Sequence, residues 1–171
     1  MKISYKWLQD YLRIDISVKE VAGLLTDIGL EVEGIEEIDS IKGGLKGVVV
    51  GKIITKEKHP NADRLNLTNV DIGGDELIQI VCGAPNVDVG QKVPVATVGT
   101  WLYDGEEKFK IKKGKIRGEE SFGMICAEYE LGLGDDNEGI MVLEDNAKVG
   151  IKASEYFNLE SDFIFDIALT P

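Results

Sequence analysis

Residues 48–54 read VVVGKII, and this short run decides how the middle of the chain folds. Valine and isoleucine branch at Cβ and favour extended backbone, so a run of this length is typical of a buried strand. Residues 39–47 before it are rich in glycine, lysine and serine, which is typical of a joint between elements. The periodicity therefore changes here from that of helices to that of strands.

Further strands are predicted after this run. They lie at residues 65–72, 77–82 and 93–98 and around Phe109 and Ile111, with additional strand-like segments at residues 122–126 and 139–143. Most of the 20 glycines fall in this region, at the ends and bends of the strands. Short strands with glycine corners favour a small closed barrel or a sandwich. We expect a five-stranded oligonucleotide-binding (OB) fold barrel, and a sandwich is the alternative.

The two ends of the chain have a different character. Ser4 can cap a first helix, and Ser17 with Glu20 forms a capping box at the start of a second helix. The other elements expected there are strands at residues 31–38 and 163–169 and a helix at residues 153–159.

We therefore predict a mainly β protein with α+β character. Residues 1–40 and 150–171 are expected to form one small, discontinuous α/β domain, and residues 41–149 to form the OB barrel inserted within it. The sequence stops in an apolar strand without a polar tail, so we expect it to be part of a longer protein.

Charge is unevenly distributed along the chain. The net charge is −12, but residues 42–118 carry 13 positive and 9 negative side chains, whereas residues 119–171 carry 2 and 13. The positive charge is densest at residues 108–117, which read KFKIKKGKIR and contain no acidic residue. A positive surface between acidic flanks indicates a site for a polyanion.

RNA binding is the first hypothesis for this basic segment. Single-stranded RNA is held by cations that follow its phosphates and by flat side chains that stack on its bases. The flat side chains available are Phe109 and, just upstream, Trp101 and Tyr103. A turn at Lys113-Gly114 would keep the cations on one outer face. The candidate phosphate contacts are Lys108, Lys110, Lys112, Lys113, Lys115 and Arg117. The alternative is an ordinary solvated strand face whose lysines protect an edge.

A second candidate region is the loop between the first two barrel strands, which reads HPNADRL from residue 59. Pro60 fixes a turn, and Asn61 and Asp63 are expected to bond back to the backbone. Lys58, His59 and Arg64 extend the candidate nucleic-acid surface, although a lone histidine in a loop more often has neither a catalytic nor a binding role.

Catalytic and metal sites are not predicted. The sequence contains no phosphate-binding glycine loop and no nucleophile next to a histidine. One histidine and two distant cysteines, Cys82 and Cys126, are too few for a zinc site and fit free thiols in a reducing cytoplasm. No secretory signal or membrane-spanning run is present, so we expect a cytoplasmic protein with no membrane contact.

Several motifs together resemble a known module. Residues 59–65, 80–87, 93–96 and 115–132 are similar, in order, to the tRNA-binding barrel shared by several tRNA synthetases and their accessory proteins. The flanking residues 1–12, 29–33 and 166–171 resemble the beta-subunit family of bacterial phenylalanyl-tRNA synthetases.

This resemblance implies an N-terminal part of a ligase that joins phenylalanine to its tRNA with ATP and magnesium. Such enzymes are α2β2 heterotetramers, with aminoacylation on the alpha subunit and editing in later domains of the beta subunit. The expected partners are therefore tRNA, the alpha subunit and the rest of the beta subunit, and the chain itself is expected to hold no cofactor. The alternative function is a scaffold or docking module with little tRNA affinity, which its acidic flanks favour.

Overall fold

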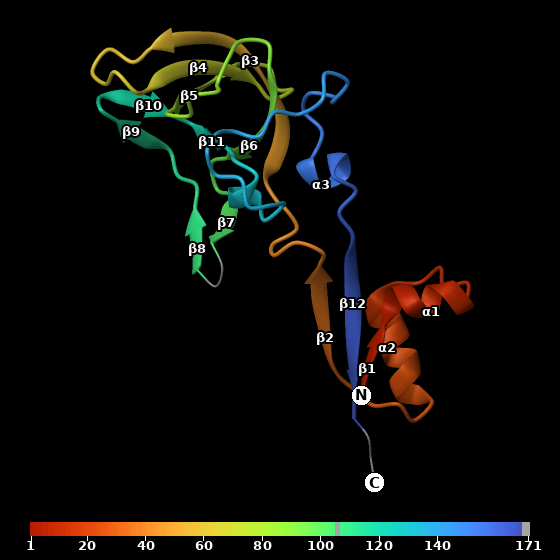
Figure 1. The fold of residues 1–171 in the computed structure, drawn as a ribbon. Helices are drawn as coiled ribbons and strands as arrows, with labels where there is room; N and C mark the ends of the chain where they lie inside the picture. Colours follow the sequence, from red (N-terminus) through yellow and green to blue (C-terminus); the bar gives the residue numbers. More distant parts are fainter. Residues whose placement is uncertain (105–106, 169–171) are drawn as a thin grey trace. The chain divides into compact units, whose positions relative to one another are not determined.

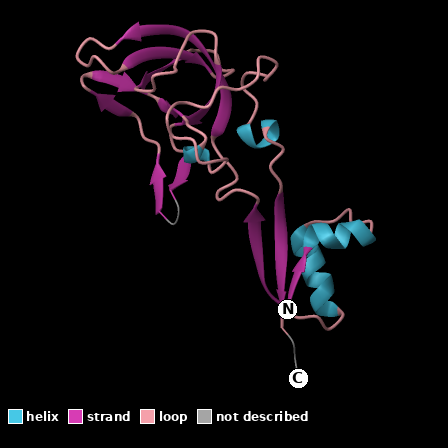
Figure 2. Ribbon diagram, viewed as in Figure 1, coloured by secondary structure: helices cyan, strands magenta, loops and turns pink. Residues whose placement is uncertain are grey.

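The computed structural model describes residues 1–104 and 107–168, which fall into two compact units (Figure 1). The smaller unit holds residues 1–40 and the described residues from 160 onward, and the larger unit holds residues 41–159. The last three residues, which include the end of the last predicted strand, lie outside the described part. Strands outnumber helices over the described residues as a whole (Figure 2), so the predicted mainly β class is confirmed.

The smaller unit contains a three-stranded antiparallel sheet and two helices. Its elements are β1 (Lys2–Ser4), α1 (Tyr5–Tyr11), α2 (Val18–Asp27), β2 (Val32–Asp39) and β12 (Ser161–Ile167). The strand order is β1-β12-β2, so β12 lies between two strands from the other end of the sequence. Phe165 and Ile167 of β12 form the core with Val21 of α2. The predicted capping box of Ser17 and Glu20 is present at the start of α2.

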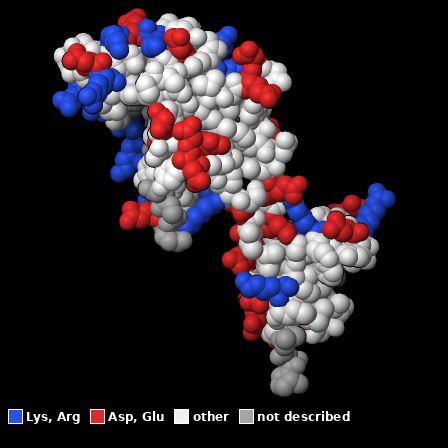
Figure 3. Space-filling model, in the orientation of Figure 1, with Lys and Arg blue, Asp and Glu red and all other residues white. Residues whose placement is uncertain are grey.

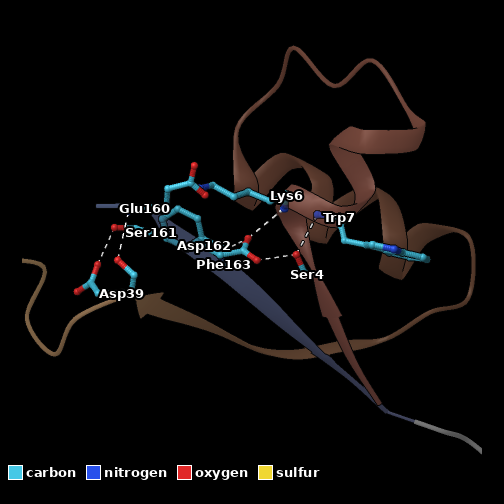
Figure 4. Close-up of polar contacts among 9 residues, drawn as sticks. Ser4, Lys6, Trp7, Asp39, Glu160, Ser161, Asp162 and Phe163 are labelled. Atoms are coloured by element: carbon cyan, nitrogen blue, oxygen red, sulfur yellow. Dashed lines mark hydrogen bonds and ion pairs between the residues drawn. The ribbon is translucent and has the colours of Figure 1, made fainter. Parts of the chain in front are cut away.

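Asp162 connects β12 to the start of α1 (Figure 4). Its carboxylate accepts hydrogen bonds from Ser4 Oγ at 2.5 Å and from the Lys6 amide at 3.0 Å. Ser4 Oγ in turn accepts from the Trp7 amide at 2.9 Å, which caps the helix. Burial works to raise the pKa of Asp162, but the hydrogen bonds from Ser4, Lys6 and Phe163 outweigh it and lower the pKa. These hydrogen bonds therefore link the N-terminal cap of α1 to strand β12 of the sheet.

The larger unit is built on a five-stranded antiparallel sheet that forms a nearly closed barrel (Figure 1). Its strands are β3 (Val48–Lys58), β4 (Asn66–Asp71), β5 (Ile78–Cys82), β6 (Lys92–Thr97) and β11 (Gly123–Ile125), in the order β11-β6-β3-β4-β5. The outer strands approach each other where the Phe122 amide donates to the Gln79 carbonyl at 2.9 Å. Fully buried Ile53, Val70 and Ile80 fill the interior. The predicted OB-type barrel is therefore confirmed.

The fifth barrel strand differs from the prediction, although the other four correspond to β3–β6. The fifth strand is β11, which lies within the strand-like segment predicted at residues 122–126 and pairs with Val95 and Ala96 of β6. Phe109, expected in the fifth strand, lies outside the barrel and is 40% exposed. Gly123 allows β11 to pair closely with β6, because a Cβ at this position would lie 2.8 Å from the Ala96 carbonyl oxygen. The predicted strand at residues 139–143 is reduced to one bridge between Leu143 and Lys92.

Residues 150–159 pack on the barrel, whereas the sequence groups them with the chain ends. The Val50 amide donates to the Ile151 carbonyl, and the Gly150 amide donates to the Val50 carbonyl. Helix α3 (Ala153–Tyr156) is shorter than the predicted helix, and its buried Ala153 belongs to the core cluster that contains Leu45 and Val48. These contacts place the segment in the larger unit.

Candidate nucleic-acid interface

Two hairpins between β6 and β11 carry the basic segment. β7 (Trp101–Asp104) pairs with β8 (Glu107–Lys110), and β9 (Gly114–Ile116) pairs with β10 (Glu119–Ser121). The single outer face expected for the cations is divided between them, because Ile111 turns inward and is only 8% exposed. Figure 3 shows Lys and Arg along the side of the larger unit where these strands lie, and all six cations of the segment are exposed. In OB-type barrels the loop between the fourth and fifth strands is a usual nucleic-acid contact.

The first hairpin gathers aromatic and basic side chains on one face. Trp101 is directly opposite Lys110, and Tyr103 is directly opposite Lys108, so all four side chains share that face. Lys108 Nζ lies 5.0 Å and Lys110 Nζ 5.5 Å from the centroid of the Trp101 ring. The other face of the hairpin holds Leu102, which is buried in the core.

The second hairpin presents Arg117 at its tip. Arg117 and Gly118 both have positive φ, +52° and +106°, as a two-residue turn between antiparallel strands requires. Glycine adopts this conformation freely, but arginine does so at a cost. Arg117 is therefore held in a disfavoured backbone conformation at the end of the hairpin.

The loop before β4 supplies the contacts that hold this tip. The ring of His59 is 5% exposed, and its Nε2 lies 2.9 Å from the Ile116 carbonyl oxygen. Its Nδ1 accepts from the Asn61 amide at 3.0 Å, so the neutral ring donates to Ile116 from Nε2. Asn61 Nδ2 also donates to the Arg117 carbonyl at 3.1 Å. Both ring nitrogens of His59 are thus engaged inside the protein, and Asn61, expected to have only a local role, joins two loops.

Lys58 and Arg64 are both exposed on this loop. Lys58 ends β3 opposite Asn66, the first residue of β4, and the His59 amide donates to the Leu65 carbonyl at 3.1 Å. The loop is therefore closed at its base, with its two cations directed to solvent. The contacts of His59 and Asn61 bring this loop against the second hairpin.

The cations differ in how far they are neutralised. Lys113 Nζ is 2.8 Å from Glu120 Oε1 and 4.6 Å from the centroid of the Phe122 ring. Within the described residues, no ion pair forms between a carboxylate and any other cation of the basic segment. Their charge is available to an anion from outside the protein. These cations are Lys108, Lys110, Lys112, Lys115 and Arg117.

The two cysteines lie inside the larger unit as free thiols. Burial raises the pKa of Cys82, and it raises the pKa of Cys126 to about 12. Across residues 1–104 and 107–168, no three His, Cys, Asp or Glu side chains are grouped so that they could hold a metal ion. Within the same residues, no helix is long and apolar enough to cross a membrane.

Comparison with known proteins identifies relatives of the whole chain. A family model described as "Putative tRNA binding domain" matches residues 48–152, more than half of the chain. Over all 171 residues the chain is 58% identical to the phenylalanine–tRNA ligase beta subunit of Porphyromonas gingivalis and 55% identical to that of Bacteroides thetaiotaomicron. The same subunit of Bacillus licheniformis is 49% identical. Each match covers the whole of this chain and 21% of the relative, so the chain spans about a fifth of the relatives' length.

Proposed function

The chain belongs to the tRNA-binding domain family, and from that membership we propose that its larger unit binds tRNA through the two basic hairpins. The observation that supports this is the set of exposed cations without a carboxylate partner between β6 and β11. Phosphate contacts of this kind position an RNA without reading its sequence. Lys108, Lys110, Lys112, Lys115 and Arg117 make the main contacts, Lys58 and Arg64 extend them, and Lys113 contributes less because Glu120 neutralises it.

His59 acts in this proposal as a positioning residue. Its buried ring fixes the backbone of the second hairpin and does not itself reach the RNA. The exposed guanidinium of Arg117 is thereby presented at a fixed place. Preorganised cations bind better, because the side chains and loops lose less conformational freedom on binding.

The relatives, which are named as phenylalanine–tRNA ligase beta subunits, support a wider role. The chain works in the cytoplasm as the N-terminal part of such a subunit, in an α2β2 enzyme with the alpha subunit. It assists tRNA binding and carries no catalytic or editing residue. The ATP and magnesium that the ligase reaction uses are held elsewhere in the enzyme. The barrel is one domain, inserted into a small α/β domain made from both ends of the chain.

A docking role is the second candidate, and an apolar groove on the smaller unit favours it. The groove has a volume of about 710 Å³ and lies between α1 and α2. Leu12, Leu24 and Ile28 line it and are each more than half exposed. The occupant in this proposal is another part of the longer polypeptide, since the matched relatives extend far beyond this chain.

Titration of the 171-residue chain with labelled tRNA at several salt concentrations tests these proposals. Three to five phosphate contacts predict that log K falls with log salt at a slope of about −2 to −4. Measurable binding near 0.15 M salt together with a slope in this range supports the tRNA-binding role. Affinity seen only at low salt, or a slope near zero, would favour the docking role.

A further inference from the structure

We propose that the outer face of the β7–β8 hairpin is a stacking site for an unpaired nucleotide. The site consists of the Trp101 ring with Lys108 and Lys110 beside it and Tyr103 as its neighbour on the same face. The proposal rests on the RNA-binding function proposed above, and it adds the kind of RNA that this hairpin selects.

Trp101 is available to a base from outside the protein. Its side chain is 44% exposed, although an indole ring gains from burial. The two lysines lie over the ring at 5.0 and 5.5 Å from its centroid, and no ion pair with a described carboxylate holds either ammonium group. An aromatic surface with two adjacent positive charges matches the two parts of a nucleotide, the flat base and the phosphate.

A base can displace the lysines from the ring. A lysine over an exposed aromatic ring is worth roughly 2- to 5-fold in an equilibrium constant, so the two together are worth roughly 5- to 30-fold. Stacking of a base on such a ring is worth roughly 5- to 150-fold in affinity. The displaced ammonium groups remain close enough to pair with the phosphates on either side of the base. With these phosphate contacts added to the stacking, the exchange favours the nucleotide.

The hairpin is held in place before any RNA arrives. Leu102 and Ile111 are buried in one core cluster, and the Ile111 amide donates to the Thr100 carbonyl at 2.8 Å. Tyr103 packs against Gly43, where an added Cβ would lie 2.4 Å from its ring carbon Cε2. Lys42 Nζ lies 5.6 Å from the centroid of the same ring. The segment 41–47 thus supports the face from one side, and the site needs little rearrangement to bind.

The geometry favours an unpaired base over a paired one. A base within a duplex is already stacked on both sides and must be extruded to reach a protein ring, whereas bases in loops and at strand ends are accessible. The lysines can bind duplex and single-stranded RNA alike, because phosphates are present in both. The preference for an unpaired base therefore comes from the Trp101 ring.

Tryptophan fluorescence gives a direct test, because the chain contains only Trp7 and Trp101. In a Trp7→Phe background, three probes of equal length are titrated: a ten-nucleotide oligocytidine RNA, the same strand annealed to oligoguanosine, and an abasic strand with the same phosphates. We expect the single strand to quench Trp101 fluorescence and the abasic strand to bind without quenching. Trp101→Ala should weaken single-strand binding about 10-fold and duplex binding less than 2-fold, with Trp101→Phe intermediate.

Two results would overturn the site. Binding of the single strand with unchanged fluorescence, or equal losses for single strand and duplex in Trp101→Ala, would leave phosphate binding intact and remove the stacking site. Failure of all three probes to bind at low salt would remove both this site and the proposed function. Circular dichroism of Trp101→Ala and Trp101→Phe confirms that the exposed ring was replaced without loss of fold.

Discussion

The ring of His59 joins two loops that are far apart in the sequence, because its Nε2 lies 2.9 Å from the backbone oxygen of Ile116. His59 is buried and the contact is partly buried, and it fixes the hairpin that ends in Arg117. The cations of the two loops are therefore positioned by one imidazole. A residue that looks like a ligand candidate in the sequence is better understood as a support for its neighbours.

Replacing His59 should lower both stability and RNA affinity. His59→Ala removes a buried ring and leaves the Asn61 amide and the Ile116 carbonyl without their partner in a partly buried place, which should cost about 1–3 kcal/mol in the free energy of unfolding. Asn61→Ala removes the more exposed bond to Arg117 and should cost about 0.5–1.5 kcal/mol. Urea unfolding followed by circular dichroism measures the free energy of unfolding of both variants, and titration with labelled tRNA measures the affinity of His59→Ala. A His59→Ala loss smaller than that of Asn61→Ala would show that the ring does not hold the hairpin.

Gly43→Ala should disturb the hairpin that carries Trp101. Gly43 has a φ of +81°, and its added Cβ would meet the Tyr103 ring at 2.4 Å. The backbone strain alone predicts a loss of about 1–2 kcal/mol in the free energy of unfolding, and the ring must also move. Gly74→Ala is the matched control, since no atom lies within 4 Å of its added Cβ and its φ is not positive. Equal thermal midpoints for the two variants would contradict the packing described for Tyr103.

How much of this arrangement the sequence predicts depends on whether the signal is local. The capping box at Ser17 and the strand at 48–54 are local patterns, and both are present. The turn at Arg117 is not foreseeable from composition, because an arginine rarely adopts positive φ and the bond that holds it comes from Asn61, 56 residues away. The same holds for Lys42, whose position over Tyr103 follows from tertiary packing alone.

The fifth strand of the barrel also could not be assigned from local sequence patterns. Alternating lysines around Phe109 and Ile111 favoured a barrel strand there, but the residues that complete the sheet are Gly123–Ile125. The sequence does predict a strand-like segment at residues 122–126, but three residues of strand carry too short a pattern to show that this segment completes the barrel sheet. Its place is decided by the close approach of Gly123 to Ala96.

Asp162 should make the smaller unit sensitive to acid. Its pKa is lowered in the folded chain, because the hydrogen bonds from Ser4 and from the Lys6 and Phe163 amides outweigh the effect of burial. A lowered pKa means that the unfolded chain binds the proton more readily. The ionised Asp162 therefore contributes its full share of the free energy of unfolding at a pH above its ordinary pKa of 3.8. That share is lost as the pH falls through the lower pKa of the folded chain.

Asp162→Asn tests this linkage. The variant should be less stable than the parent chain at pH 7 and should lose less stability between pH 5 and pH 2, as measured by urea unfolding at each pH. Asp166→Asn, on the same strand, is the control. Parallel stability profiles for the parent and Asp162→Asn would contradict the assigned role of this carboxylate.

The most direct measurement of the central claim compares tRNA affinity for two charge-reversed chains. One carries Lys108→Glu, Lys110→Glu and Lys115→Glu, and the other carries the same change in net charge at exposed lysines elsewhere: Lys19→Glu, Lys52→Glu and Lys148→Glu. We predict that the first set lowers affinity at least 10-fold and makes the salt slope shallower by about 2–3, while the second changes affinity about 2-fold. Equal losses for the two sets, or an unchanged affinity for the first, would contradict binding through the hairpins.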